Sequence, residues 1–204
     1  MLRAATRRGR YRRGVSADPD VSAPAIPEDE DLRLDALRAT DLLDTPKEER
    51  FDRITRLLPR VLGVPISVIN FIDADRQWSK SCVGVPSADA PRVSSFCAHA
   101  ILGEAPLIVP DTLRDRRFAK NPMVLGEPFV RAYAGQPVHD PSGYRIGTLC
   151  AADREPRDWS DGDLRTLFAL AKWVELELAA DGLRRRAEAA EARLRELRDA
   201  PGAA

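Results

Sequence analysis

The chain of 204 residues is poor in the side chains from which protein metal sites are built. It has two histidines, His99 and His139, and three cysteines, Cys82, Cys97 and Cys150. Neither a CxxC pair nor a His/Cys cluster at zinc-binding spacing occurs, so we predict no metal site. An odd number of cysteines at wide spacing is typical of free thiols in a reducing compartment, and we therefore expect a cytoplasmic protein.

Long apolar stretches are also missing from the sequence. No run approaches the ~20 residues that a membrane-spanning helix needs, and no apolar signal-peptide core is found. We therefore expect neither a membrane span nor secretion. With 44% hydrophobic and 31% charged residues, the composition is that of one globular domain with tails.

Charge is unevenly distributed, although the formal net charge is zero. Residues 1–17 contain no acidic residue but carry Arg3, Arg7, Arg8, Arg10, Arg12 and Arg13. Such an arm is either attracted to nucleic acid, anionic lipid or an acidic partner, or it is a solvated leader. We favour the leader and expect no nucleic-acid binding. Residues 18–31 are acidic and rich in proline, so we predict a disordered leader and linker over residues 1–30.

Two helices are predicted before the first strand. The first begins near Asp31, and its apolar stripe consists of Leu32, Ala36, Ala39 and Leu43. The run from Thr45 to Glu48 fits a capping box at the start of the second helix. We expect Pro59 to kink or shorten this second helix, whose core-facing residues are Phe51, Ile54, Leu58, Val61 and Leu62.

Five apolar or alternating runs predict the strands of one antiparallel sheet: residues 66–72, 76–83, 107–109, 129–136 and 144–152. The first is apolar on both faces except at Ser67 and Asn70, which is typical of a central strand. The second alternates and is expected near an edge, whereas the third is expected to be buried. The last two form a hairpin around a turn that contains proline and glycine.

A short helix and a long loop lie between these strands. Ser94 or Ser95 is predicted to cap the short helix, which ends at Gly103. Residues 111–128 carry too much charge and proline for a regular element. A loop of ~18 residues in a compact domain is usually a lid or a binding loop.

A long helix is predicted from about Ser160 to about Arg198. One apolar stripe should pack on the sheet: Leu164, Leu167, Phe168, Ala171, Val174 and Leu178. A second stripe, on another face, follows a heptad repeat: Ala169, Trp173, Leu176, Ala180, Leu183, Ala187, Ala190, Leu194 and Leu197. Because a sustained heptad repeat is typical of a coiled-coil seam, we predict a parallel homodimer through this helix. We expect a soft joint at Asp181-Gly182, since glycine weakens a helix.

Five segments follow one another in the order helix, strand, loop and hairpin: SSFCAHAI (94–101), PLIVPD (106–111), RRFAKNP (116–122), RAYAGQP (131–137) and YRIGTLCAAD (144–153). In this order they resemble a GAF domain, a small-molecule sensor module of bacterial signalling proteins, from about Leu32 to about Leu178. The resemblance implies an α+β fold, with a central antiparallel sheet of five or six strands, terminal helices on one face and a loop-covered pocket on the other. We accordingly predict a GAF domain over residues 31–180 and a coiled-coil helix extension with a tail over 181–204.

The resemblance also implies a non-enzymatic sensory or regulatory role in signal transduction, with an unknown small molecule in the pocket or a scaffold role through dimerisation. It specifies no cofactor, and we find no catalytic set of nucleophile, base and acid. No kinase, cyclase or output domain follows in the sequence, so we expect the signal to leave through such a partner in trans. The candidate ligand-binding residues are Phe96, Cys97, His99, Asp111, Phe118, Asn121, Arg131 and Tyr133.

Cys97 and His99 leave several interpretations open. Related GAF proteins attach a bilin to a cysteine beside a histidine, but here Ala98 separates the two residues. His99 could ligate a haem iron, and Cys97 could be a redox switch or the thiolate of an enzyme similar to free methionine-(R)-sulfoxide reductase. We favour a small buried side chain at Cys97, and structural roles for Cys82 and Cys150.

The cationic loop after the third strand has two interpretations. Arg116, Arg117, Lys120 and Asn121 could hold an anionic ligand, with Arg131 and Tyr133 on the strand below. In the interpretation that we favour, Asp111, Asp115 and Arg117 pair within the loop while Phe118 fills the pocket.

Overall fold

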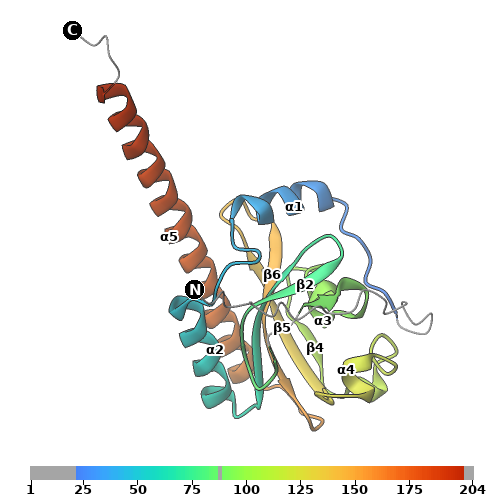
Figure 1. Cartoon of the computed structure of the whole chain (residues 1–204). Helices are drawn as coiled ribbons and strands as arrows, with labels where there is room; N and C mark the ends of the chain where they lie inside the picture. Colours follow the sequence, from blue (N-terminus) through green and yellow to red (C-terminus); the bar gives the residue numbers. More distant parts are fainter. Residues whose placement is uncertain (1–21, 87–88, 200–204) are drawn as a thin grey trace, which may run out of the picture.

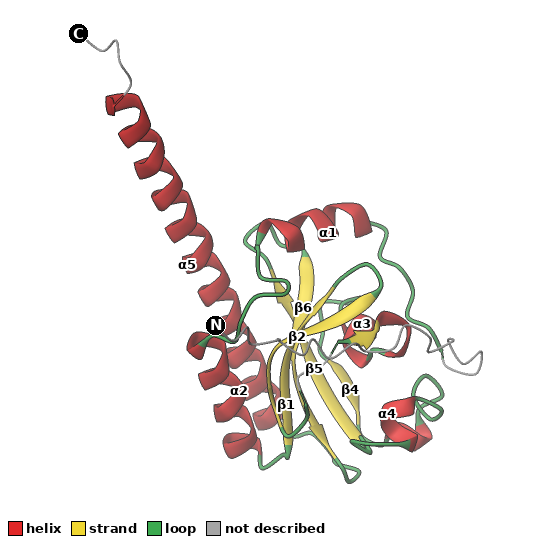
Figure 2. Ribbon diagram, in the orientation of Figure 1, coloured by secondary structure: helices red, strands yellow, loops and turns green. Residues whose placement is uncertain are grey.

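The computed structural model describes residues 22–86 and 89–199, so residues 1–21 of the leader predicted over 1–30 lie outside the described part. One six-stranded antiparallel sheet has the order β3-β2-β1-β6-β5-β4 (Figures 1 and 2). Its strands are β1 (Ile66–Ile72), β2 (Arg76–Val83), β3 (Ala90–Pro91), β4 (Leu107–Val109), β5 (Ala132–His139) and β6 (Arg145–Asp153). The helices are α1 (Glu30–Ala39), α2 (Glu49–Leu62), η1 (Arg92–Ser94), α3 (Phe96–Ala100), η2 (Thr112–Arg114), α4 (Pro122–Leu125) and α5 (Asp161–Asp199).

The sheet separates two hydrophobic cores, which confirms the predicted arrangement of layers. α2 and α5 lie side by side against one face (Figure 2), where the core includes Phe51, Ile54, Leu58, Val174 and Leu178. The second core lies beneath α3 and α4 and includes Phe96, Ile101, Val109, Phe118 and Tyr133. β1 is buried along its whole length between these layers, as a central strand should be.

α1 is rotated relative to the predicted stripe, of which Ala36 and Leu43 pack against the core but Leu32 and Ala39 are exposed. Leu32 is 56% exposed, whereas Arg33, Leu34 and Leu37 are buried. The Arg33 guanidinium binds the Ile72 carbonyl at 2.7 Å and pairs with Glu30 at 2.8 Å. Because these polar contacts set the rotation of the helix, the apolar stripe alone gave the wrong orientation.

α2 begins at Glu49 without a side-chain cap, so the predicted capping box is wrong. The Thr45 hydroxyl donates to the Leu42 carbonyl and accepts from Lys80, and is therefore unavailable to the helix. The helix continues past Pro59 to Leu62, and Gly63 ends it with a left-handed φ of 67°. Val61, predicted in the core, is exposed on the far side.

Two predictions about the segment between α3 and β5 are also corrected. β4 is an edge strand in which only Val109 is buried, because one of its sides has no neighbouring strand. The loop over residues 111–128 contains η2 and α4, whose first turns are capped by the side chains of Asp111 and Asn121. Ser95 caps α3, which ends at Ala100 rather than at Gly103.

α5 confirms the long helix and most of its core-facing stripe. Leu167, Ala171, Val174 and Leu178 are buried, together with Leu170, whereas Phe168 is half exposed. On another face of the helix Leu176, Leu183 and Leu194 are 68%, 61% and 66% exposed. The second half of α5 projects away from the globular body (Figure 1). Among the described helices, none is both long and apolar enough to cross a bilayer.

Candidate functional site

Aromatic side chains fill the space beneath α3, where the sequence predicts a pocket. Phe96 stacks on Phe118 with ring centroids 4.1 Å apart and lies 5.1 Å from Tyr133. His99 meets Phe118 edge-on at 5.0 Å. Phe118 is fully buried, so the prediction that it fills this space is confirmed. Four of the eight candidate residues thus form one aromatic cluster.

Cys97 lies next to this cluster and accepts hydrogen bonds from two strands. Asn70 on β1 donates through Nδ2 at 3.2 Å, and Tyr133 on β5 donates through Oη at 3.3 Å. The Asn70 amide is oriented by Ser79, whose hydroxyl donates to Asn70 Oδ1 at 2.7 Å. Both donors therefore point their polar hydrogens at the same sulfur atom, inside an otherwise apolar core.

Cys150 on β6 belongs to the same buried cluster as Cys97. Burial raises the pKa of Cys97, but hydrogen bonds from Cys150, Tyr133 and Asn70 outweigh that effect and lower the pKa to about 6. The hydrogen bond with Cys97, together with burial, raises the pKa of Cys150 well above its usual range. The two thiols are therefore chemically unequal, and Cys97 is the one that ionises first.

The Thr148 hydroxyl also faces Cys97. It is fully buried, and it has no hydrogen-bond partner within the described residues. This hydroxyl is therefore free to donate to a thiolate at Cys97, whose charge would otherwise be poorly solvated in the core.

His99 and Asn121 connect the neighbourhood of α3 to two other segments, the one before α1 and the loop over residues 111–128. His99 contacts the Ser22 carbonyl through Nε2 at 3.1 Å, and burial lowers the pKa of His99. Asn121 is buried and donates to the Ser94 carbonyl at 2.8 Å, which ties the loop to the turn before α3.

Asp111 and Arg131 lie apart from the aromatic cluster and pair with each other at 3.0 Å. Asp115 pairs with Arg117 at 2.6 Å, so the predicted pairing within the loop is confirmed for these two residues. An open hollow of about 530 Å³ lies beside these pairs and is lined by Val109, Pro110, Asp111, Arg114, Asp115, Arg116 and Arg117. It could receive a small acidic ligand, since arginine binds carboxylate and phosphate well.

Sequence reasoning missed two features of this molecule. It assigned Cys150 a structural role, because nothing local shows that α3 covers the face of β6 that carries Cys150 and Thr148. Asn70 interrupts an apolar strand, and a polar residue at such a position indicates a buried polar cluster. The second missed feature is a chain of charges that connects β2 to α5.

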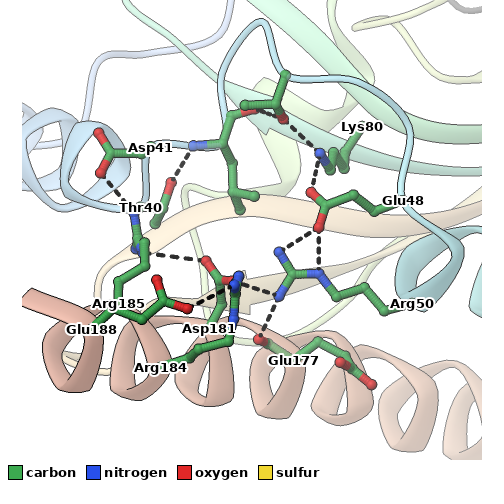
Figure 3. Close-up of polar contacts among 12 residues, drawn as sticks. Thr40, Asp41, Glu48, Arg50, Lys80, Glu177, Asp181, Arg184, Arg185 and Glu188 are labelled. Atoms are coloured by element: carbon green, nitrogen blue, oxygen red, sulfur yellow. Dashed lines mark hydrogen bonds and ion pairs between the residues drawn. The ribbon is translucent and has the colours of Figure 1, made fainter. Parts of the chain in front are cut away.

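This chain of charges begins at Lys80 on β2, which is 1% exposed (Figure 3). Its ammonium donates to Thr45 Oγ1 at 2.6 Å and to the Pro46 carbonyl at 2.8 Å, and it pairs with Glu48 at 2.5 Å. A buried ammonium needs such partners, because desolvation without them costs several kcal/mol. Lys80 therefore fixes the segment that leads into α2.

From Glu48 the contacts continue to α5 through Arg50, which pairs with Glu48 at 2.8 Å and with Asp181 at 3.1 Å (Figure 3). Arg185 binds Asp181 at 3.3 Å and reaches Asp41 at 2.7 Å. Burial raises the pKa of Asp181, but the arginines around it outweigh burial and lower the pKa. The helix is continuous through Asp181-Gly182, the position predicted as a soft joint, and Asp181 forms ion pairs with Arg50 and Arg185 there.

Comparison with known proteins identifies the family. The GAF domain model matches residues 46–178. A cyclic di-GMP phosphodiesterase of Pseudomonas aeruginosa is 39% identical over 137 residues, which make up 67% of this chain and 23% of that protein. The chain therefore corresponds to less than a quarter of this relative's length.

Solved structures share the fold at low sequence identity. The GAF domain of an Acinetobacter phosphoenolpyruvate-protein phosphotransferase has a TM-score of 0.56 at 18% identity, with 73% of this chain and 93% of that chain covered. The free methionine-R-sulfoxide reductase of Neisseria meningitidis has a TM-score of 0.56 at 16% identity, with 82% and 99% covered. On the fold, the ordered motifs and the family match, this chain belongs to the GAF domain family.

Proposed function

We propose that this chain is a non-enzymatic regulatory module of bacterial signal transduction. It dimerises through α5 and passes changes in its sheet to a partner enzyme in trans, such as a kinase or a cyclase. The observation that carries the proposal is the exposed leucine stripe of α5, which continues past the globular body while the opposite side of the helix is packed on the sheet.

The exposed stripe suits a second copy of the same helix. Leu176, Leu183 and Leu194 belong to one heptad register, and the 39-residue helix is about 58 Å long. Fully burying a leucine contributes roughly 1.5–3 kcal/mol, so the six leucines of a dimer contribute roughly 6–12 kcal/mol at their present exposure. Association costs about 4–15 kcal/mol, so these leucines give a micromolar dissociation constant only when the gain is near its upper end and the cost near its lower end.

The charged chain from Lys80 to Asp181 supports the transmission part of the proposal. It joins β2, the entry to α2 and α5 at the point where α5 leaves the body (Figure 3). A shift of the sheet that moves Lys80 changes the position of Glu48 and then of Arg50. The helix responds at Asp181, in the middle of the proposed seam.

The similarity to a cyclic di-GMP phosphodiesterase supports a signalling context. In that protein the matched region is one part of a much longer chain, so a related module accompanies an enzyme of cyclic dinucleotide turnover. A small molecule that alters the loop over residues 111–128 or α3 is the expected input. Native mass spectrometry of the protein as isolated is the measurement that identifies such a molecule.

Sedimentation equilibrium at tens of micromolar tests the dimer. We expect wild-type protein to approach twice its 22.6 kDa mass, and a variant with Leu176→Glu, Leu183→Glu and Leu194→Glu to remain a monomer. Glutamate is a good helix former, so α5 itself should persist. Leu32→Glu, which changes a leucine of similar exposure on α1, is the matched control and should dimerise normally. Wild-type protein that stays monomeric contradicts the proposal.

The placement of Cys97 and Cys150 in one buried cluster favours one alternative, a thiol enzyme similar to free methionine-(R)-sulfoxide reductase. That activity requires a thiolate that attacks the sulfoxide sulfur and a second thiol that resolves the oxidised intermediate. An assay of free methionine-(R)-sulfoxide reduction with wild-type protein and Cys97→Ala decides it. Turnover that is lost in Cys97→Ala supports the enzyme, and absence of turnover in wild-type protein removes it.

A further inference from the structure

We propose that Cys97 and Cys150 are a redox-active pair that hydrogen peroxide, or another hydroperoxide, converts to an intramolecular disulfide between α3 and β6. This covalent modification would lie in the second core, beneath α3 and α4. It is independent of the dimer proposed above, since neither residue lies on α5.

The position of the two cysteines carries the proposal. Cys97 is the second residue of α3, which packs on β5 and β6, and Cys150 lies in the middle of β6. In the sheet Cys150 is opposite Gly135 on β5, and the Tyr133 hydroxyl, which donates to the Cys97 sulfur at 3.3 Å, lies over Gly135. Both cysteines belong to the same buried cluster beneath α3, and a disulfide between them requires the sulfur atoms to close to about 2.05 Å.

Cys82 cannot form a disulfide with Cys150. It lies on β2 opposite Val68, and Val68 in turn lies opposite Cys150. Two strand spacings, about 10 Å, therefore separate Cys82 from Cys150, which is too far for a disulfide. Cys82 is partly exposed and provides an internal control thiol in the same protein.

The surroundings assign different roles to the two thiols. Asn70 and Tyr133 both donate to the Cys97 sulfur, at 3.2 and 3.3 Å, and the Thr148 hydroxyl is free to add a third hydrogen bond. These donors stabilise a thiolate at Cys97, which is the nucleophilic form. Cys150 keeps its proton and acts as the resolving thiol.

The chemistry is a two-electron oxidation. The Cys97 thiolate attacks one oxygen of hydrogen peroxide, the O–O bond breaks, and hydroxide leaves and takes up the proton that the thiol had released. Cys97 is then a sulfenic acid. The Cys150 sulfur attacks the Cys97 sulfur, the S–O bond breaks, and the departing hydroxide takes the Cys150 proton. Two thiols and one peroxide become one disulfide and two water molecules.

Access to the pair requires a local opening of α3, because Cys97 and Cys150 are 2% and 4% exposed. α3 has only five residues, and Ser95 holds its first turn by accepting from the Ala98 amide at 2.9 Å. Segments of this size open far more readily than whole domains unfold. We therefore expect oxidation to be slow and limited by opening, and the disulfide to hold α3 closed on β6.

The test exposes the reduced full chain to hydrogen peroxide under native conditions. Remaining thiols are then alkylated in denaturant, and the digested protein is analysed by mass spectrometry. We expect a linked pair of peptides that contain Cys97 and Cys150, and a Cys82→Ser variant should form the same link. In Cys150→Ser, Cys97 should accumulate as a sulfenic acid that dimedone traps.

Tyr133→Phe removes one donor to the thiolate, so disulfide formation should slow several-fold at neutral pH and recover as the pH is raised. The proposal is overturned if Cys97 and Cys150 are completely alkylated in a sample in which peroxide has oxidised Cys82. A link that involves Cys82 also overturns it. These outcomes are read from wild-type protein and Cys82→Ser, and they hold even if another variant fails to fold.

Discussion

Replacing Lys80 with methionine tests whether the charges between the sheet and α5 act as one unit. Methionine keeps most of the apolar stem but removes the ammonium, which lies 5.6 Å from the ring centroids of both Phe51 and Trp78. The two hydrogen bonds to Thr45 and Pro46 are worth about 1 kcal/mol each. The cation–π contacts add about 0.5–1 kcal/mol.

The ion pair with Glu48 adds only about 1 kcal/mol, since the Glu48 side chain is 34% exposed and keeps its contact with Arg50. Against these losses, the variant no longer buries an ammonium, which returns about 1–2 kcal/mol. The net expectation is a loss of about 2 kcal/mol in the free energy of unfolding. Urea titration followed by tryptophan fluorescence measures it, and a loss below about 0.5 kcal/mol refutes the reasoning.

A double-mutant cycle with Asp181→Asn then measures the connection to α5. If Glu48 and Arg50 transmit the change, the effects of Lys80→Met and Asp181→Asn should differ from additivity by about 0.5–1 kcal/mol. Effects that add within about 0.3 kcal/mol mean that the two ends are independent, which removes this route for the signal.

Three further predictions concern stability. Burial raises the pKa of Glu30, but hydrogen bonds from two buried arginines outweigh it and the pKa falls to about 2. Because this pKa is depressed in the folded protein, the stabilisation is complete above pH ~4.5 and is lost as the pH falls toward ~2. Glu30→Gln should therefore cost about 2 kcal/mol at pH 7 and little at pH 2, as urea titrations at both pH values would show. Gly147→Ala should cost about 3 kcal/mol or more, since its Cβ would lie 2.2 Å from the Asn70 carbonyl oxygen; an unchanged melting temperature contradicts this. Phe118→Ala should cost about 3–5 kcal/mol in urea titration because the ring is fully buried, whereas Leu113→Ala in the same loop should change stability by less than about 0.5 kcal/mol.

The strands and the long helix could be predicted because their signals are local. Residues 66–72 are apolar on both faces, and the two stripes of α5 repeat at helical spacing. Each pattern therefore indicates the type of element and which of its faces are buried. The orientation of α1 could not be predicted in this way. A buried arginine, which a hydrophobicity pattern counts as exposed, decides which face of α1 meets the sheet.

Part of the candidate site could also be predicted. Phe96, Cys97, Phe118 and Tyr133 do come together beneath α3, because the order of motifs places a helix and a loop over one face of the sheet. Asp111 and Arg131 instead pair with each other outside this cluster. The capping box failed for a related reason, since Thr45 is held by Lys80, which follows it by 35 residues.

The order of elements, the family and the two opposed stripes of α5 are determined by the sequence alone, because periodicity and turn residues act over a few positions. The placement of Cys97 and Cys150 in one buried cluster and the charge chain from Lys80 to Asp181 are decided only by the tertiary structure. Both join residues far apart in the chain, and their proximity depends on which face of the sheet each helix covers. Packing settles that choice, since buried polar groups must find partners wherever the folded chain brings them together.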